Sequence, residues 1–323
     1  MTKLTSLIAA AALALAACDP AEDPAKEFRD ALPKADAVQV GTPQAEGTAG
    51  ALTVAPNALG DSPALQSEYA ITSYYLAVTV NSGVGWMLRF LQFVTTFPPT
   101  TCDAKTCTWG PWVDNEGLNR WKLVVHKVGD AAYEYQLSAQ PGSNPAAPFV
   151  AFITGTAHPV DRDHGSGTFT IDFDAQDALD HGGLWVKKDF GQIVVDHDNT
   201  AGVSIDATFL NARNNDPNHP DRLNAVYSFR RASSGGVLQV AFENLDTTEV
   251  VSLRTRWSPS GAGRADAHYN GPGTPRVDYY ASECWAGEVQ SYVEVYDSKH
   301  PEIGPETACS PFNSAEYADV VLP

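Results

Sequence analysis

The stretch RWKLVVHKVGDAAYEYQLS, residues 120–138, indicates the fold class of this 323-residue chain. Trp121, Leu123 and Val125 alternate with polar side chains, and the alternation resumes over residues 133–138. Successive side chains of a β-strand point to opposite faces of the sheet. A period of two therefore predicts strands that each have one buried face and one wet face.

The same alternation continues along the rest of the chain. Gly- and Ser-rich turns at residues 232–236 and 258–262 each separate two expected strands. No helical pattern alternates with the strands. We expect further strands near residues 148–156, 169–173, 190–197, 203–209, 222–231, 236–243, 249–257, 263–269, 276–285 and 288–296. The predicted fold is mostly β, either an antiparallel barrel or a strongly curved sheet, and a β-sandwich is the alternative.

Residues 63–97 form an apolar segment that predicts one or two helices packed on or inside the sheet. Its apolar residues recur at spacings of three and four, residues 81–85 are expected to break or bend the helix, and Pro98 and Pro99 end it. A pair of strands over residues 69–80 is a second interpretation. A transmembrane span is a third, although it would bury Arg89.

This segment also supplies the candidate ligand site. If the helix lies loosely in the sheet, the side chains of Trp86, Met87, Phe90 and Phe93 would line a pocket for an apolar ligand. If it packs tightly, the same side chains are only core.

The N-terminus carries the pattern of an export signal. Lys3 is followed by the apolar run 4–15 and by two small residues, and Cys18 follows them directly. This junction resembles the lipobox of bacterial lipoproteins, in which the peptide is cut before the cysteine and the thiol is lipidated. We therefore expect a signal peptide over residues 1–17 and a lipid on Cys18. An ordinary secretory signal is the alternative.

Both interpretations export the chain, and the lipid would anchor it on the extracytoplasmic side of a bacterial membrane, inner or outer. Residues 18–62 are rich in Ala, Pro, Gly and acidic residues and read as a flexible tether. Residues 35–40 are the part of that tether that could dock on the folded unit. A single β-rich domain over residues 63–323 then follows.

Four cysteines remain after Cys18. An even number in an exported chain predicts two disulfides, and the short separations favour Cys102 with Cys107 and Cys284 with Cys309. A zinc site with four cysteine ligands would need the Cys-x-x-Cys spacing that this sequence lacks.

The remaining chemistry is sparse. A formal charge of −18 disfavours nucleic acid as a partner. Residues 164–167, HGSG, resemble a nucleophile motif, but the pattern is more typical of a hairpin turn. The acidic loops 161–172 and 196–199 match calcium loops only weakly. We predict no catalytic residue, no metal site and no cofactor.

Two further groups of side chains bear on glycan chemistry and on the wet face. Asp172, Asp174 and Asp206 share the solvent side of their strands, which does not place them in a cleft. The tryptophans, which stack on sugars in glycan sites, are expected to be mostly core. Residues 254–256 and 264–268 are expected to form a polar ladder on the outer face.

Several motifs carry a resemblance over nearly the whole mature chain. They are the lipobox, FPPT at 97–100, TWGPW at 108–112, RW at 256–257 followed by GAGRAD at 261–266, and ECW at 283–285. Together they resemble a group of uncharacterised bacterial lipoproteins, which implies an architecture and no activity. A curved sheet around an apolar helix is also similar to lipid-carrying lipoproteins. The functional prediction is a non-enzymatic envelope lipoprotein that binds an apolar or lipidic ligand or a protein partner, and a carbohydrate-active enzyme or glycan-binding module is the alternative.

Overall fold

The structure is a computed structural model of the whole chain. It describes residues 23–43, 67–114, 117–176, 179, 189–214, 221–272, 275, 277–286 and 295–323. The expected signal peptide, Cys18 and Trp185 lie outside the described residues.

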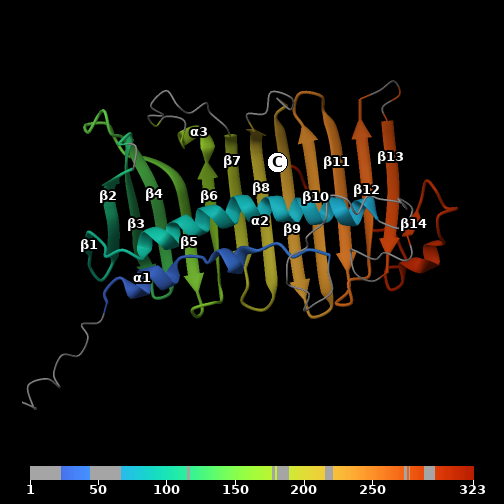
Figure 1. The fold of residues 1–323 in the computed structure, drawn as a ribbon, viewed down its shortest axis with the longest axis horizontal. Helices are drawn as coiled ribbons and strands as arrows, with labels where there is room; N and C mark the ends of the chain where they lie inside the picture. The colour runs from blue at the N-terminus through green and yellow to red at the C-terminus, as the bar shows by residue number, and fades with distance from the viewer. Residues whose placement is uncertain are drawn as a thin grey trace, which may run out of the picture.

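A single antiparallel sheet of fourteen strands dominates the fold (Figure 1), and the strands pair in chain order. They are β1 (Thr101–Cys102), β2 (Thr106–Val113), β3 (Asn119–Gly129), β4 (Ala132–Pro141), β5 (Val150–Pro159), β6 (Gly165–Asp172), β7 (Asp189–Asp198), β8 (Val203–Asn214), β9 (Leu223–Ala232), β10 (Gly235–Asn244), β11 (Glu249–Trp257), β12 (Gly263–Gly271), β13 (Val277–Trp285) and β14 (Val295–Asp297).

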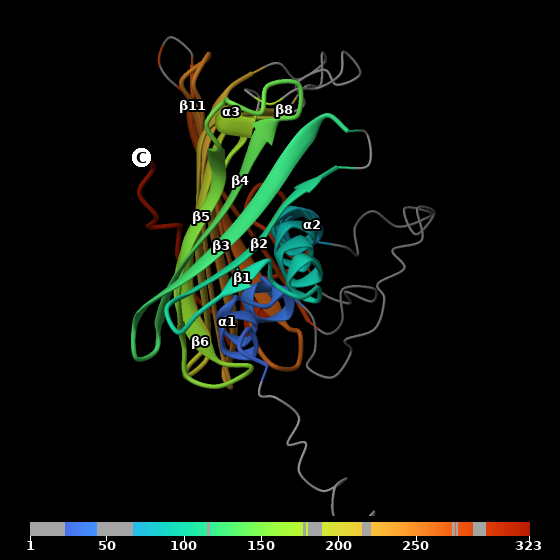
Figure 2. The ribbon, with the colours of Figure 1, turned by 90° about the vertical axis from the view of Figure 1, so that its left-hand side faces the viewer.

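The prediction of a mostly β, antiparallel fold is confirmed. The order runs from β1 at one edge to β14 at the other without joining them, so the barrel is not confirmed and the sheet is open. The alternative of a sandwich fails as well, because all the described strands belong to one sheet. Figure 2 shows this sheet bent into a trough, with helices inside the trough. We call the inside of the trough the concave face and the outside the convex face.

One long helix, α2 (Glu68–Thr95), lies across the strands on the concave face (Figures 1 and 2). Ser67 caps it by accepting a hydrogen bond from the backbone N–H of Ala70 at 3.1 Å. The helix ends just before Pro98, as predicted, but the expected break at residues 81–85 is wrong. Glycine lowers helix stability by only about 1 kcal/mol, and burial of one face of the helix outweighs that amount.

The strand interpretation of residues 69–80 is also wrong, since they are helical. None of the helices in the described ranges combines the length and the hydropathy that a bilayer span requires. The inward side chains of α2 share one core with the inward residues of the sheet. The buried apolar residues of this helix that belong to that core are Ala77, Val80, Val84, Met87, Leu88, Leu91 and Val94.

Residues 23–43 form an arm that packs beside α2 on the same face. The arm contains α1 (Lys26–Ala31) and the 3-10 helix η1 (Ala35–Val38), and it buries Phe28, Leu32 and Val40 in the core. The amide of Asn81 in α2 accepts from the backbone N–H of Val40 at 2.7 Å and donates to its carbonyl at 2.8 Å. A flexible tether over the whole of residues 18–62 is therefore wrong for residues 23–43. The docking alternative for residues 35–40 is what the structure shows, as a 3-10 helix rather than an extended strand.

Residues 298–323 cover part of the convex face and include the 3-10 helix η3 (Glu306–Cys309). In Figure 2 the C-terminus lies on the side of the sheet opposite α2. Both predicted cysteine pairs lie together, Cys102 with Cys107 and Cys284 with Cys309. A four-residue helix, α3 (Phe173–Gln176), follows β6, so the strand expected near residues 169–173 ends at Asp172.

Candidate functional site

Three of the four predicted lining residues have described side chains, and these three do not converge on a cavity. Met87 is buried in the core, whereas Phe90 is half-buried and meets the Trp121 ring edge-on, with 6.4 Å between centroids. Phe93 points outward and is 59% exposed. The side chain of Trp86 lies outside the described residues. Tight packing of α2, the second of the two predicted cases, is what the described side chains show.

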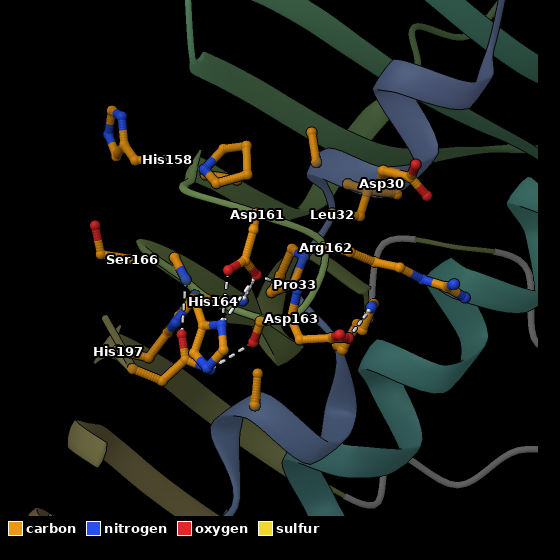
Figure 3. A pocket seen from close by; sticks show the side chains of 17 residues that line it. Asp30, Leu32, Pro33, His158, Asp161, Arg162, Asp163, His164, Ser166 and His197 are labelled. Atoms are coloured by element: carbon orange, nitrogen blue, oxygen red, sulfur yellow. Dashed lines mark hydrogen bonds and ion pairs between the residues drawn. The ribbon is translucent and has the colours of Figure 1, made fainter. Parts of the chain in front are cut away.

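A small pocket lies between the arm and the end of the β5–β6 hairpin (Figure 3), and its volume is about 30 Å³. Residues 30–34 of the arm form one wall and residues 157–166 form the other. His197 and Asn199, from the end of β7, complete it.

His197 is the unusual residue of this pocket. It points to the concave face, because it is two residues from buried Val195 and is the cross-strand partner of Gly167 and Ile205. Its side chain is 8% exposed, and neither ring nitrogen has a hydrogen-bond partner among the described residues. Burial lowers the pKa of His197 to about 4, so the ring is neutral at pH 7.

A neutral imidazole offers one donor and one acceptor. A pocket of about 30 Å³ has room for one water molecule, which would pair with only one of the two ring nitrogens, because their hydrogen bonds point in divergent directions. That volume is an order of magnitude below the roughly 300–1,000 Å³ of sites for organic ligands. The pocket therefore suits a water and not a substrate.

The rim of the pocket explains the first acidic loop. The Asp161 carboxylate accepts the backbone N–H groups of Asp163 and His164, both at 2.8 Å, and the His164 ring at 2.9 Å. These hydrogen bonds lower the pKa of Asp161. Lys34 from the arm pairs with Asp163 at 2.5 Å. The carboxylates thus shape a turn and hold the arm, and within the described ranges no group of three His, Cys, Asp or Glu residues is arranged to hold a metal.

The predicted hairpin turn lies at residues 160–164, so only His164 of the HGSG motif belongs to it, and residues 165–167 begin β6. Ser166 pairs across the sheet with His158 and Asp198, so all three point to the convex face, away from His197. No hydrogen bond joins Ser166 to His164 in the described part of the chain. The arrangement lacks the contact between nucleophile and base that acyl transfer requires.

The polar ladder expected on the outer face is buried where the C-terminal segment covers it. Asp266 is fully buried and accepts from Arg264 Nε at 2.8 Å, Arg256 at 3.1 Å, the Ser282 hydroxyl at 2.6 Å and the backbone N–H of Glu316 at 2.9 Å. The expectation of a wet face is therefore wrong for this cluster. Arg256 and Arg264 are 6% and 1% exposed.

Carboxylates from the C-terminal segment complete the cluster. Glu306 pairs with Arg264 at 2.9 Å, and Glu316 pairs with Arg256 at 2.5 Å. Every strong contact of the cluster is internal to the chain, so it fastens the C-terminal segment to the sheet. Sequence reasoning missed it, because alternation reports which face a residue is on and not what covers that face.

In the described part of the chain, several of the side chains considered for glycan chemistry are buried or paired. Trp109, Trp257 and Trp285 are buried, so they offer no stacking platform. The Asp206 carboxylate forms a two-pronged pair with Arg230, with distances of 3.0 and 2.6 Å.

Exposed apolar side chains lie instead on the outward face of α2 and just after its end. Tyr75 is 51% exposed and Val78 is 37% exposed near the N-terminal end of the helix. Phe93 and Phe97 are 59% and 54% exposed at the other end, and their rings meet edge-on at 5.3 Å. We call these four residues the outward apolar face. The helical spacing of residues 75, 78 and 93 was visible in the sequence, but the choice of inward and outward sides was not.

Comparisons with protein-family models, curated proteins and solved structures found no match. The resemblance to bacterial lipoproteins stays a prediction.

Proposed function

We propose that this chain is a non-enzymatic, lipid-anchored protein of a bacterial cell envelope, and that its domain binds an apolar or lipidic ligand along the outward apolar face. The anchor is Cys18, and the domain stands on the extracytoplasmic side of the membrane. The observation that carries the binding proposal is the exposure of Tyr75, Phe93 and Phe97 on and directly after a helix whose other side is core. Phe93 and Phe97 adjoin each other, with their ring centroids 5.3 Å apart, whereas Tyr75 and Val78 stand near the other end of the helix; an exposed apolar cluster of this kind marks a candidate binding surface.

The contacts of α2 argue for binding on the helix rather than beneath it. Ser73 meets Thr255 at 2.5 Å in the core, and Asn81 is doubly bonded to Val40 of the arm. Glu283 accepts from the Ser67 hydroxyl at 2.7 Å and from the backbone N–H of Tyr69 at 3.0 Å, at the start of the helix. A ligand that had to displace α2 would break all of these contacts. One that binds the outward face breaks none of them.

A fluorescent fatty acid titrated into the mature protein tests the binding proposal. We expect Phe93→Ser to weaken the affinity at least fivefold, because it removes exposed apolar surface without disturbing the core. Val128→Ser is the matched control, since Val128 is 58% exposed on the sheet, away from the helix. Equal affinities in both variants and the wild type would rule out the outward apolar face as the site.

The anchor is tested separately. Cys18→Ala should abolish incorporation of labelled fatty acid and release the protein from the membrane fraction after a salt wash. A variant that stays acylated and bound would show that the lipobox interpretation is wrong. If the anchor holds but no fatty acid binds, a protein partner on the same face becomes the better proposal.

A further inference from the structure

The described arm begins beside the far end of α2. Asp23 and Pro24 line an open hollow of about 740 Å³ together with Thr96 and residues 98–102, which follow the helix. The start of the arm is held against the sheet by Glu27, which pairs with Lys127 of β3 and accepts from the Tyr133 hydroxyl of β4 at 2.5 Å. In Figure 1 the arm enters below the end of α2 that lies over the first strands.

The chain between Cys18 and this point is short. Asp23 is the fifth residue after Cys18, and a fully extended chain spans at most about 3.3–3.6 Å per residue. The lipidated residue therefore lies within about 18 Å of Asp23, whatever path the chain takes. A flexible tether of the length first expected would reach about twice as far. Docking of the arm thus leaves the domain close to the membrane and fixes which end is nearest.

That end has a surface suited to lipid. Residues 93–102, FVTTFPPTTC, contain no charged side chain, although the whole chain carries a charge of −18. Phe93 and Phe97 are more than half exposed in this stretch. Aromatic side chains are favourable at the boundary between head groups and acyl chains. The carboxylate of Asp23, which lines the same hollow as residues 98–102, is paired with Arg29, and this pairing reduces its repulsion by anionic lipid.

We infer that the surface formed by residues 93–102 lies on the lipid bilayer, with Phe93 and Phe97 in the head-group region. The inference rests on the proposed anchor at Cys18. It names the bilayer as the partner of this end of the outward apolar face. Because the start of the arm and the anchor lie at the Phe93 end of α2, the Tyr75 end lies farther from the anchor, by about 27 Å for eighteen residues at 1.5 Å rise.

Photo-crosslinking tests this orientation. Benzoylphenylalanine is placed at Phe93 in one variant and at Tyr75 in the other, and both positions are about half exposed on the same helix. The lipidated full-length protein is reconstituted in phosphatidylcholine vesicles and irradiated. We expect crosslinks to lipid from position 93 at several times the yield from position 75. Equal yields, or crosslinks from position 93 to a second copy of the chain, would overturn the inference.

Failure of the anchor is recognised independently in the same samples. Mass spectrometry of the N-terminal peptide reports whether Cys18 carries acyl groups. An acylated, vesicle-bound protein without lipid crosslinks at position 93 overturns the orientation alone. A chain without acyl groups overturns the anchor and the orientation together.

Discussion

Two segments without strand structure of their own cover the two faces of the sheet, and they do so with opposite chemistry. On the concave face, α2 buries aliphatic side chains such as Leu88 and Leu91. On the convex face, residues 298–323 bury a charged cluster around Asp266. Figure 2 shows the C-terminus on this side of the sheet, opposite α2. The alternation along a strand shows which side chains share a face of the sheet. Whether a polar face is exposed to solvent depends on the segment that packs over it. The following predictions test how each cover is held.

The largest effect is expected on the convex face. Asp266→Ala leaves Arg256 and Arg264 buried without their shared carboxylate, and breaking a buried ion pair in this way costs about 3–5 kcal/mol. Denaturant unfolding measures the loss. Asp206→Ala is the control, because its pair with Arg230 is largely exposed and should contribute less than about 1 kcal/mol. Similar losses in the two variants would show that the C-terminal cover does not depend on the cluster.

On the concave face, a cavity beneath α2 should lower the free energy of unfolding nearly as much. Leu91→Ala removes a side chain that is 1% exposed, and we expect a loss of about 3 kcal/mol in the free energy of unfolding. Phe93→Ala, on the outward side of the same helix, should change it by less than about 0.5 kcal/mol. A small loss at Leu91 would instead reveal collapsible space beneath α2, and it would favour a ligand that enters under the helix.

Acid should weaken the contact between the arm and the sheet through His197. The pKa of this residue is lowered by burial from 6.5 to about 4 in the folded state. Its contribution to stability is therefore present above pH 6.5 and is lost as the pH falls toward 4. At pH 5 the loss amounts to about 2 kcal/mol.

His197→Leu separates this loss from the titration of carboxylates elsewhere, because only the difference between variant and wild type reports on the histidine. The free energy of unfolding should decrease less between pH 7 and pH 5 in the variant than in the wild type. The same drop in both proteins would mean that the ring is hydrated well enough to protonate in place.

The smallest effect is expected at the start of α2. Burial raises the pKa of Glu283, so its contribution to stability is greatest below pH 4.5 and is lost as the pH rises through the folded pKa. Glu283→Gln stays neutral and keeps an oxygen for Ser67 and Tyr69. We expect the variant to lie within about 1 kcal/mol of wild type at pH 7 and to lack this pH dependence. A much less stable variant would show that the helix start requires the negative charge.

Local patterns predicted what depends on local geometry. The alternation at residues 120–138 corresponds to β3 and β4, and most of the other expected strands lie within two residues of the observed ones. Part of the strand expected near residues 288–296 falls outside the described residues. The two cysteine pairs followed from short separations, and the end of α2 followed from Pro98 and Pro99.

Contacts between distant segments were beyond the reach of these patterns. Glu316 meets Asp266 across fifty residues, and Lys34 meets Asp163 across more than a hundred. Neither position has a periodic signal, because each covering segment is irregular. The composition of residues 18–62 was read correctly as lacking regular periodicity, yet Phe28 and Val40 were enough to dock the arm. For the candidate site, sequence found the aromatic residues of α2 but could not tell inward Met87 from outward Phe93.

The open sheet has two free sides, and they differ in how well they suit the addition of another strand. At one side β1 has two residues, and the part of β2 beyond it is interrupted by a bulge between Trp109 and Trp112 and by Pro111, which has no N–H to donate. At the other side the described β14 has three residues. A disulfide lies at each of these sides, joining Cys102 to Cys107 and Cys284 to Cys309. The β1 side is thus protected against growth into aggregates by strand addition. At the other side, β14 pairs only with residues 283–285 in the described part of the chain, so residues 277–281 of β13 form the edge at which strand addition would begin.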